Sequence, residues 1–391
     1  MNAEWESLFD GSLTHLSESA EQTDNEFDAL AELPARRGVL LFADAHNQPI
    51  VLIQTANLRS LARSRLARAP DQQPHRKADL AAVTRQIYYA CCENDFQRQL
   101  LYQRLTHELF GKAWKKWLVL PRRSYAVLDR QRAFAFFAVT ASVEASPSKE
   151  LFGPFANRRA AALFCESLNT AFELCRNLAL LDSGNPQSCP YLQMHTCHGL
   201  CCQDHGQGVY ANHLERAVRC AEGDIAPAVE DLRRQMKQAA AGLDFETAQL
   251  RKKQADQLSR LCHPEFAWTG RLATVRLVVV VFGGKAPAKD SNKKVRCWQL
   301  WLIDLDGVYL MGRFAEDDPE TLRDLLSRTL QPAQKPPPYP YARSRQEHLA
   351  TVFWLLYRKN RPGLWYNAAH SVPEGATILD DVSASLPSGR A

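Results

Sequence analysis

One stretch decides how the rest of the sequence is interpreted: Cys189-Pro190-Tyr191-Leu192-Gln193-Met194-His195-Thr196-Cys197-His198-Gly199-Leu200-Cys201-Cys202. With Cys175 upstream, it spaces Cys175, Cys189, Cys197 and Cys201 with 13, 7 and 3 residues between them. Residues four apart fall on one face of a helical turn, and Pro190 and Gly199 favour turns that curl the backbone around an ion. Because thiolates suit zinc and iron–sulfur centres, this spacing predicts a four-cysteine metal site.

Two alternatives to an iron–sulfur centre stay open at this point. The thiols can be ordinary buried side chains, although six of the eleven cysteines fall within the 38 residues from Cys165 to Cys202. The metal can instead be zinc, with His195, His198 and His205 available as nitrogen ligands. Cys202 is a spare thiol that competes with Cys201.

A helical hairpin is predicted directly after the cysteines, from Leu232 to Leu258. Apolar residues recur there at helical spacing, Gly242 suits a helix C-terminus, and Asp244 suits the N-cap of the second helix. Two helices of this size bury little apolar surface by themselves, so we expect a partner protein to cover them. Packing against the rest of the same chain is the alternative.

Several strings around these features resemble the excision-repair nuclease subunit UvrC and its shorter relative Cho. They are Phe152-Gly153-Pro154-Phe155-Ala156-Asn157, Ala171-Phe172-Glu173-Leu174-Cys175, Cys189-Pro190-Tyr191-Leu192 and Cys197-His198-Gly199-Leu200-Cys201. The resemblance implies a 4Fe-4S iron–sulfur cluster on Cys175, Cys189, Cys197 and Cys201. The hairpin is similar to the UVR motif, which implies docking on a UvrB-like helicase subunit through Leu243, Phe245, Ala248, Leu250 and Arg251.

The N-terminal third predicts a β-hairpin followed by a helix. Two apolar runs, 39–42 and 50–53, are joined by a polar segment, and Asn57 can cap the helix that follows. This arrangement resembles the GIY-YIG nuclease fold of the same family.

The residues expected to cleave DNA are replaced. The family's two tyrosines fall on Leu40 and Val51, its glycine on Ile53, its lysine on Gln54, its arginine on Leu61 and its metal-binding glutamate on Tyr102. Phosphodiester hydrolysis needs an activated water, a metal and a nearby cation, which these side chains do not supply. We therefore assign no catalytic residue and expect magnesium only if activity is retained. A shifted alignment can offer Glu93, Asp95 or Glu108 as a metal ligand, so an active Cho-like single-incision endonuclease and a zinc-stabilised scaffold protein remain alternatives.

Basic residues indicate contact with damaged DNA. Aromatic residues lie among the second of the two basic groups, and cations pair with phosphates while aromatic faces stack on bases. The expected DNA-binding residues are Asn57, Arg59, Arg63, Lys112, Lys115, Lys116, Arg122 and Arg123. A solvated basic face is the alternative.

Composition bounds the remaining expectations. The 391 residues are 46% hydrophobic and 23% charged, with a net charge of +5. No apolar run approaches the roughly 18–20 residues of a membrane span, and no signal segment opens the chain, so we expect a cytoplasmic protein.

The predicted fold class is α+β, with a small antiparallel sheet near the C-terminus and a charged, flexible loop from Lys285 to Lys294. The expected organisation is a flexible leader (1–34), a degenerate GIY-YIG domain (35–118), a connector (119–174), a cysteine-rich segment (175–225), the UVR hairpin (226–262), a β-rich domain (263–330), a proline linker with a helix (331–370) and a disordered tail (371–391).

Overall fold

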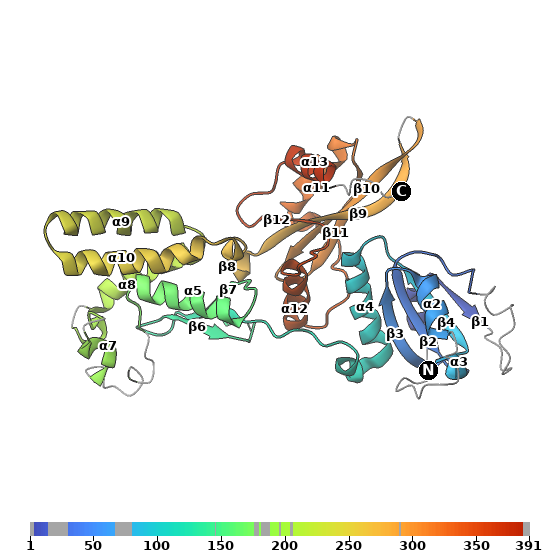
Figure 1. Ribbon diagram of the computed structural model, residues 1–391, viewed down its shortest axis with the longest axis horizontal. Helices are drawn as coiled ribbons and strands as arrows, with labels where there is room; N and C mark the ends of the chain where they lie inside the picture. Colours follow the sequence, from blue (N-terminus) through green and yellow to red (C-terminus); the bar gives the residue numbers. More distant parts are fainter. Residues whose placement is uncertain are drawn as a thin grey trace.

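The computed structural model describes residues 4–14, 30–66, 80–144, 146–175, 180, 188–194, 197–203, 206–288 and 291–385. Three antiparallel sheets with helices packed on them confirm the α+β class. The molecule is elongated (Figure 1): the N-terminal sheet lies at one end, a long helical hairpin at the other, and the C-terminal sheet between them. No helix in the described ranges has the length and apolar character needed to cross a bilayer.

The N-terminal sheet has the strand order β1-β4-β2-β3, formed by β1 (Gly11–Thr14), β2 (Gly38–Ala43), β3 (Pro49–Thr55) and β4 (Gln86–Cys91). The predicted hairpin is confirmed, with Leu40 opposite Ile53. Alternate residues of β2 face opposite sides: Val39 packs with α4 (Asp95–Phe110), and Leu40 packs with α2 (Leu58–Leu66). The predicted cap is also present, because the Asn57 side-chain oxygen accepts a hydrogen bond of 3.0 Å from the Ser60 amide.

Residues 4–14 and 30–34 of the expected flexible leader are ordered, and residues 15–29 lie outside the described part. The leader contains a short 3-10 helix, η1 (Glu4–Leu8), and the edge strand β1, which pairs with β4. Trp5 and Phe9 pack on Tyr88 with ring centroids 5.1 and 5.6 Å apart. These aromatic side chains bury apolar surface and so order residues 4–14.

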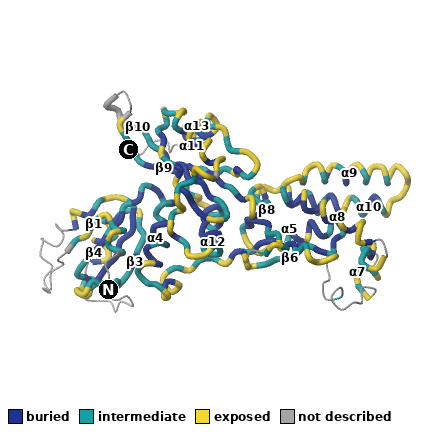
Figure 2. The backbone as a smooth tube through the Cα atoms, turned by 180° about the vertical axis from the view of Figure 1, so that it is seen from behind, coloured by how far each residue is buried: buried dark blue, intermediate teal, exposed yellow. Residues whose placement is uncertain are grey.

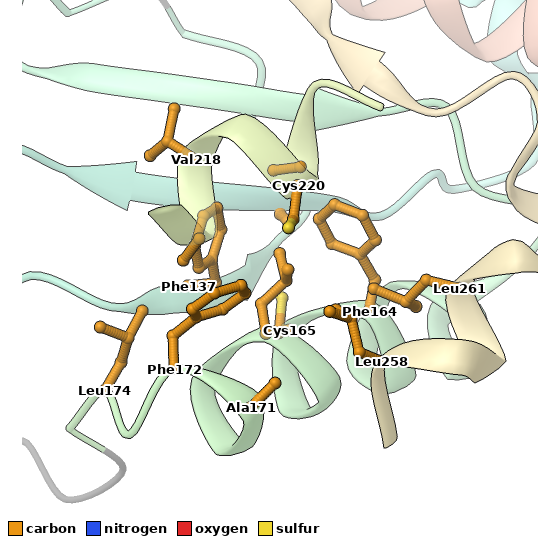
Figure 3. Packing of buried hydrophobic residues seen from close by; sticks show 14 of the residues in the cluster. Phe137, Phe164, Cys165, Ala171, Phe172, Leu174, Val218, Cys220, Leu258 and Leu261 are labelled. Atoms are coloured by element: carbon orange, nitrogen blue, oxygen red, sulfur yellow. The ribbon is translucent and has the colours of Figure 1, made fainter. Parts of the chain in front are cut away.

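The middle region is a small sheet covered by helices. Its strand order is β6-β5-β7-β8, from β5 (Tyr125–Asp129), β6 (Phe137–Thr140), β7 (Lys149–Gly153) and β8 (Gly270–Arg271). Helix α5 (Arg158–Ala171) is capped by Asn157. Figure 3 shows Phe137, Phe164 and Phe172 packed around Cys165 and Cys220, the latter from α8 (Gly206–Ala221).

The predicted helical hairpin is confirmed as α9 (Ile225–Ala241) and α10 (Phe245–Ser259). Its base packs on the middle region through buried Leu232 and Leu258. The alternative of packing on the same chain therefore holds for the base, while the tip projects from the molecule (Figure 2). Short 3-10 turns, η5 (Arg260–Cys262), η6 (Pro264–Phe266) and η7 (Leu272–Thr274), lead into the C-terminal sheet.

The C-terminal sheet has the order β11-β10-β9-β12, from β9 (Arg276–Ala288), β10 (Ser291–Asp304), β11 (Val308–Ala315) and β12 (Leu364–Asn367). Helices α11 (Pro319–Thr329) and α13 (Gly375–Ala384) pack on one face. Helix α12 (Arg345–Leu356) packs on the other, together with Phe96 and Leu100 of α4. Helix α4 therefore belongs to two cores at once.

A turn containing Asp306 and Gly307 joins β10 and β11. Two expectations for this region differ from the structure. The expected loop from Lys285 to Lys294 instead continues β9 and β10, apart from residues 289–290, which lie outside the described part. Strand β12, which was not predicted, follows the predicted helix, and the expected disordered tail contains α13, because Trp365, Ile378 and Val382 are buried against the sheet.

Candidate functional site

All four predicted metal-binding cysteines line one pocket. Cys175 follows α5, Cys189 is the N-cap of α7 (Pro190–Gln193), and Cys197 and Cys201 flank Gly199. Gly199 has a left-handed backbone with φ 64°, which turns the chain back on itself between the two cysteines. Apolar groups complete the lining, including Phe134, Leu174, Leu192 and Tyr210.

The sulfurs of this pocket act on one another. Burial, a hydrogen bond to Cys202 and the charges of Cys202, Cys175 and Cys197 raise the pKa of Cys201 to about 12. The Cys201 and Cys202 sulfurs are 3.8 Å apart, and the Gly199 amide donates to the Cys197 sulfur at 3.4 Å. Among the described side chains, no group of three or more metal-ligating residues is close enough to hold an ion in this arrangement. The four cysteines have the chemistry to bind a metal centre as thiolates, and they share one pocket. Their described positions do not already form a closed binding site.

Of the three histidines considered as zinc ligands, only His198 lies within the described residues. His195 and His205 lie outside them. The Nδ1 atom of His198 lies 2.5 Å from a Glu173 carboxylate oxygen, so this ring is engaged by an acid.

Glu173 was not singled out as a functional residue from the sequence. Besides contacting His198, its carboxylate accepts a hydrogen bond from the Gln254 side chain at 3.0 Å and forms an ion pair with Arg251 at 3.6 Å. Its φ of 54° is unusual for a residue with a side chain. Glu173 therefore connects the cysteine segment to α10. In the sequence, the only sign of this role is an acidic residue between two apolar ones, Phe172 and Leu174.

Two cysteines outside the predicted ligand set are structural. Cys165 and Cys220 are buried among phenylalanines (Figure 3). Burial raises the pKa of each thiol to about 12, which keeps it protonated and unreactive.

The tip of the α9–α10 hairpin presents two large apolar side chains to solvent. Leu243 is 74% exposed and Phe245 is 66% exposed. The backbone of Leu243 is left-handed, with φ 58°, whereas the preceding Gly242 has a negative φ. Asp244 caps α10 by accepting from the Thr247 amide at 3.0 Å, as predicted.

The other expected partner-binding residues lie differently. Ala248 is buried between the helices and offers no free surface, and Leu250 is half-buried. Arg251 is engaged by Glu173 and by Gln254, to which it donates at 2.8 Å. The exposed apolar patch is therefore the tip alone.

The nuclease-like positions are filled by core and capping residues. Leu40 is fully buried, and Leu61, Val51 and Ile53 pack in the same core beneath α2. Tyr102 packs on the opposite side of the sheet, where burial raises its pKa. Because these positions sit on two faces of one sheet, they do not converge on a site.

The carboxylates considered as replacements are committed elsewhere. Glu93 pairs with Arg36 at 2.9 Å, and Asp95 pairs with Arg37 at 2.8 Å. Glu108 lies 4.0 Å from Arg343.

Three expected DNA-binding residues have structural roles instead. Arg123 is 8% exposed and donates to the Ala156 carbonyl at 3.1 Å, so its charge lies inside the protein. Arg59 donates to the Leu33 carbonyl at 2.8 Å, and Asn57 is the helix cap described above. The exposed residues are Arg63, Lys112, Lys115, Lys116 and Arg122.

The exposed cations form two groups rather than one surface. Arg63 belongs to α2, on one face of the N-terminal sheet, whereas Lys112, Lys115 and Lys116 follow α4 on the other face. Trp117 stacks on Phe110 beside the lysine group, with ring centroids 4.2 Å apart.

Comparison with known proteins finds a family match for the middle region. A family model described as "UvrC/Cho excinuclease, middle domain" matches residues 125–220, which contain strands β5, β6 and β7 of the small sheet, α5, the four cysteines and nearly all of α8. Over part of its length, the chain is similar to the UvrC/Cho excinucleases.

The individual similarities are modest. The chain is 28% identical over 194 residues to "Excinuclease cho" of Shigella flexneri, covering 48% of this chain and 62% of that protein. It is 29% identical over 219 residues to the Cho protein of Salmonella typhimurium, covering 54% and 71%. It is 25% identical over 284 residues to "UvrABC system protein C" of Moorella thermoacetica, covering 67% and 44%.

The chain thus spans less than two thirds of the length of the first Cho relatives it matches. No solved structure matches the chain.

Proposed function

We propose that this UvrC/Cho relative is a DNA-binding component of nucleotide excision repair that docks on a UvrB-like helicase subunit and has lost its GIY-YIG incision site. The observation that carries the proposal is the hairpin tip, where Leu243 and Phe245 are exposed at the end of two helices whose base is packed on the chain. Exposed aromatic and aliphatic pairs on a rigid helical support are typical of protein-binding anchors.

The loss of incision follows from the chemistry of the nuclease-like positions. An aliphatic core at Leu40 and Leu61 cannot activate a water, and the phenol of Tyr102 is a poor ligand for magnesium. The domain keeps its fold because the same substitutions add apolar surface to the two sides of the sheet.

The cysteine pocket supports a structural centre, with Cys175, Cys189, Cys197 and Cys201 as the residues that would hold it. A bound iron–sulfur cluster or zinc ion would supply cross-links between segments that have few other contacts. The surrounding apolar groups would shield it from solvent.

The decisive experiment mixes the pure protein with a UvrB-like subunit and a lesion-bearing duplex and looks for a ternary complex by size-exclusion chromatography. We expect a complex with the wild type and at least a tenfold loss of partner affinity in the Leu243→Ala/Phe245→Ala variant, since anchors of this kind contribute more than about 1.4 kcal/mol. Leu330→Ala is the matched control, because Leu330 is also an exposed leucine, on the C-terminal domain. Absence of any complex with the wild type would refute the proposal.

The similarity to Cho proteins favours a second candidate, a single-incision DNA endonuclease. A nicking assay on the same duplex with magnesium or manganese separates the two. We expect no nicking; metal-dependent nicking that persists in Tyr102→Ala and Arg59→Ala would establish an active site formed by other residues.

A further inference from the structure

Strands β9 and β10 continue beyond their sheet as a two-stranded ribbon (Figure 1). On one side, β12 pairs with β9 only as far as Val280. On the other side, the last contact with the β11 strand is the Glu316 amide, which donates to the Arg296 carbonyl at 3.1 Å. Past that point the described parts of β9 and β10 pair only with each other. At about 3.3 Å per residue, the free ribbon extends roughly 15 Å.

The base of the ribbon is held by the N-terminal domain. The Asn94 side chain donates to the Phe282 carbonyl at 2.9 Å and to the Gln299 side chain at 3.2 Å. Gly284 has φ 98°, and a Cβ atom there would lie 3.2 Å from a Glu93 carboxylate oxygen, so a side chain does not fit easily. A register shift between Arg296 and Trp298 bends the ribbon at the same level. The direction of the ribbon is therefore fixed by packing.

The strand register collects positive charge on one face of the ribbon. Lys285 lies opposite Arg296, and Pro287 lies opposite Lys294. Directly opposed residues, and residues two apart on one strand, share a face, so Lys285, Lys294 and Arg296 are on the same side. Ala286 and Val295 form the other side. Arg296 pairs with Glu316 at 2.9 Å, whereas Lys285 and Lys294 are both exposed.

Positive charge concentrated on one face lowers the stability of the ribbon unless an anion neutralises it. Glu316 offsets the charge of Arg296, but the two exposed lysines on this face repel each other, and an isolated two-stranded ribbon is marginally stable in water. The sequence from 285 to 296 contains five cations and one acid. A polyanion is the partner that such a surface fits.

We propose that the β9–β10 ribbon is a DNA-binding arm whose basic face, carrying Lys285 and Lys294, contacts the phosphates of duplex DNA. The major groove of B-form DNA is about 12 Å wide and admits a two-stranded ribbon, which brings such a face close to the phosphates that line it. The inference rests on the proposed DNA-binding function and adds a contact in the C-terminal domain.

The test is the salt dependence of binding to an undamaged duplex, measured by fluorescence anisotropy with the full chain. Each lysine–phosphate contact contributes about 0.9 to the slope of log affinity against log salt, so Lys285→Ala/Lys294→Ala lowers the slope by about 2 and weakens binding to every sequence alike. The charge-conserving Lys285→Arg/Lys294→Arg variant keeps the wild-type slope. Arg323→Ala is the matched control, because Arg323 is an exposed cation on α11 of the same domain.

The outcomes distinguish the arm from the proposed function. Lysine and proline on a ribbon also prevent edge-to-edge strand pairing. If the double alanine variant self-associates while its salt slope is unchanged, the lysines serve that purpose and the arm is refuted. If the wild type binds no duplex at all, the proposed DNA-binding function is refuted together with the arm.

Discussion

At the scale of single residues, Leu243 combines two costs at one position of the hairpin tip. Its backbone is left-handed, which costs a residue with a side chain roughly 1–2 kcal/mol, and its apolar side chain is 74% exposed. Glycine meets the same backbone requirement without the steric cost. A leucine held in this way supports the proposal that the side chain contacts a partner outside the folded chain.

This reasoning predicts opposite effects of Leu243→Gly on stability and docking. We expect the free energy of unfolding to rise by up to about 1 kcal/mol, because the backbone strain is relieved, while affinity for the UvrB-like subunit falls. Thermal unfolding and calorimetric titration measure the two quantities. Leu243→Ala separates them, since it removes the contact without relieving the backbone. A Leu243→Gly variant that binds as well as the wild type would show that the side chain is not an anchor.

Arg123 illustrates a cation whose role the sequence misassigned. It stands among exposed basic residues in the chain, yet its guanidinium is buried, donates to the Ala156 carbonyl, and has a pKa lowered by burial. Arg123→Ala leaves that carbonyl without its partner, so we expect a loss of about 1–3 kcal/mol in stability with unchanged duplex affinity.

Lys115→Ala provides the contrasting case, because Lys115 is exposed. Surface substitutions change stability by no more than about 0.5 kcal/mol, whereas loss of a phosphate contact weakens DNA binding. Chemical unfolding and duplex titration of both variants test the pair. A loss of DNA affinity in Arg123→Ala without a loss of stability would contradict this assignment.

At the scale of elements, α12 contains a histidine that links stability to pH. His348 is buried, with Nδ1 2.6 Å from the Tyr341 hydroxyl and Nε2 2.7 Å from the Asp304 carbonyl. A carbonyl only accepts, so Nε2 of His348 donates to Asp304. In the neutral ring, Nδ1 then accepts from the Tyr341 hydroxyl. Burial lowers the pKa of His348 in the folded state, so the unfolded chain binds the proton first as pH falls.

We therefore expect the free energy of unfolding to be insensitive to His348 above about pH 7 and to fall as pH drops below the unfolded pKa of about 6.5. The slope approaches about 1.4 kcal/mol per pH unit for this one group. Burial also lowers the pKa of His107 on α4, which adds a second contribution of the same sign. Urea unfolding between about pH 5 and 8 measures the slope, and His348→Gln reduces it. An unchanged slope in that variant would mean that folding does not lower the pKa of His348.

Local signals in the sequence predicted elements well, and long-range contacts account for what they missed. The hairpin at 38–55, the cap at Asn57 and the α9–α10 hairpin follow from alternation, helical spacing and turn residues. Strand β1 and helix α13 were not predicted, because each is ordered by apolar contacts with distant parts of the chain. The burial of Arg123 and the links of Glu173 likewise depend on partners far away in sequence.

At the scale of the whole molecule, the functional features divide between two ends. The cysteine segment and the hairpin tip lie at one end, and the N-terminal domain and the base of the β9–β10 ribbon lie toward the other (Figures 1 and 2). Within the docking end, Glu173 connects His198, next to Cys197, with Arg251 and Gln254 of α10. Within the other end, α4 joins the N-terminal domain to the C-terminal sheet.

This division predicts that loss of the proposed metal centre affects partner docking more than DNA binding. Cys175→Ser removes one of four thiolates, so we expect the purified protein to lose its metal and, if the centre is an iron–sulfur cluster, its absorption near about 400 nm. The affinity for the UvrB-like subunit falls, because the segment that supports α10 through Glu173 is no longer cross-linked. The salt slope of duplex binding stays at the wild-type value, because the lysines that set it lie at the other end.

Cys262→Ser is the matched control, since Cys262 is exposed and outside the pocket. Full metal content in the Cys175→Ser protein would exclude Cys175 from the ligand set, and a change in DNA binding without a change in docking would contradict the division of the molecule into two ends.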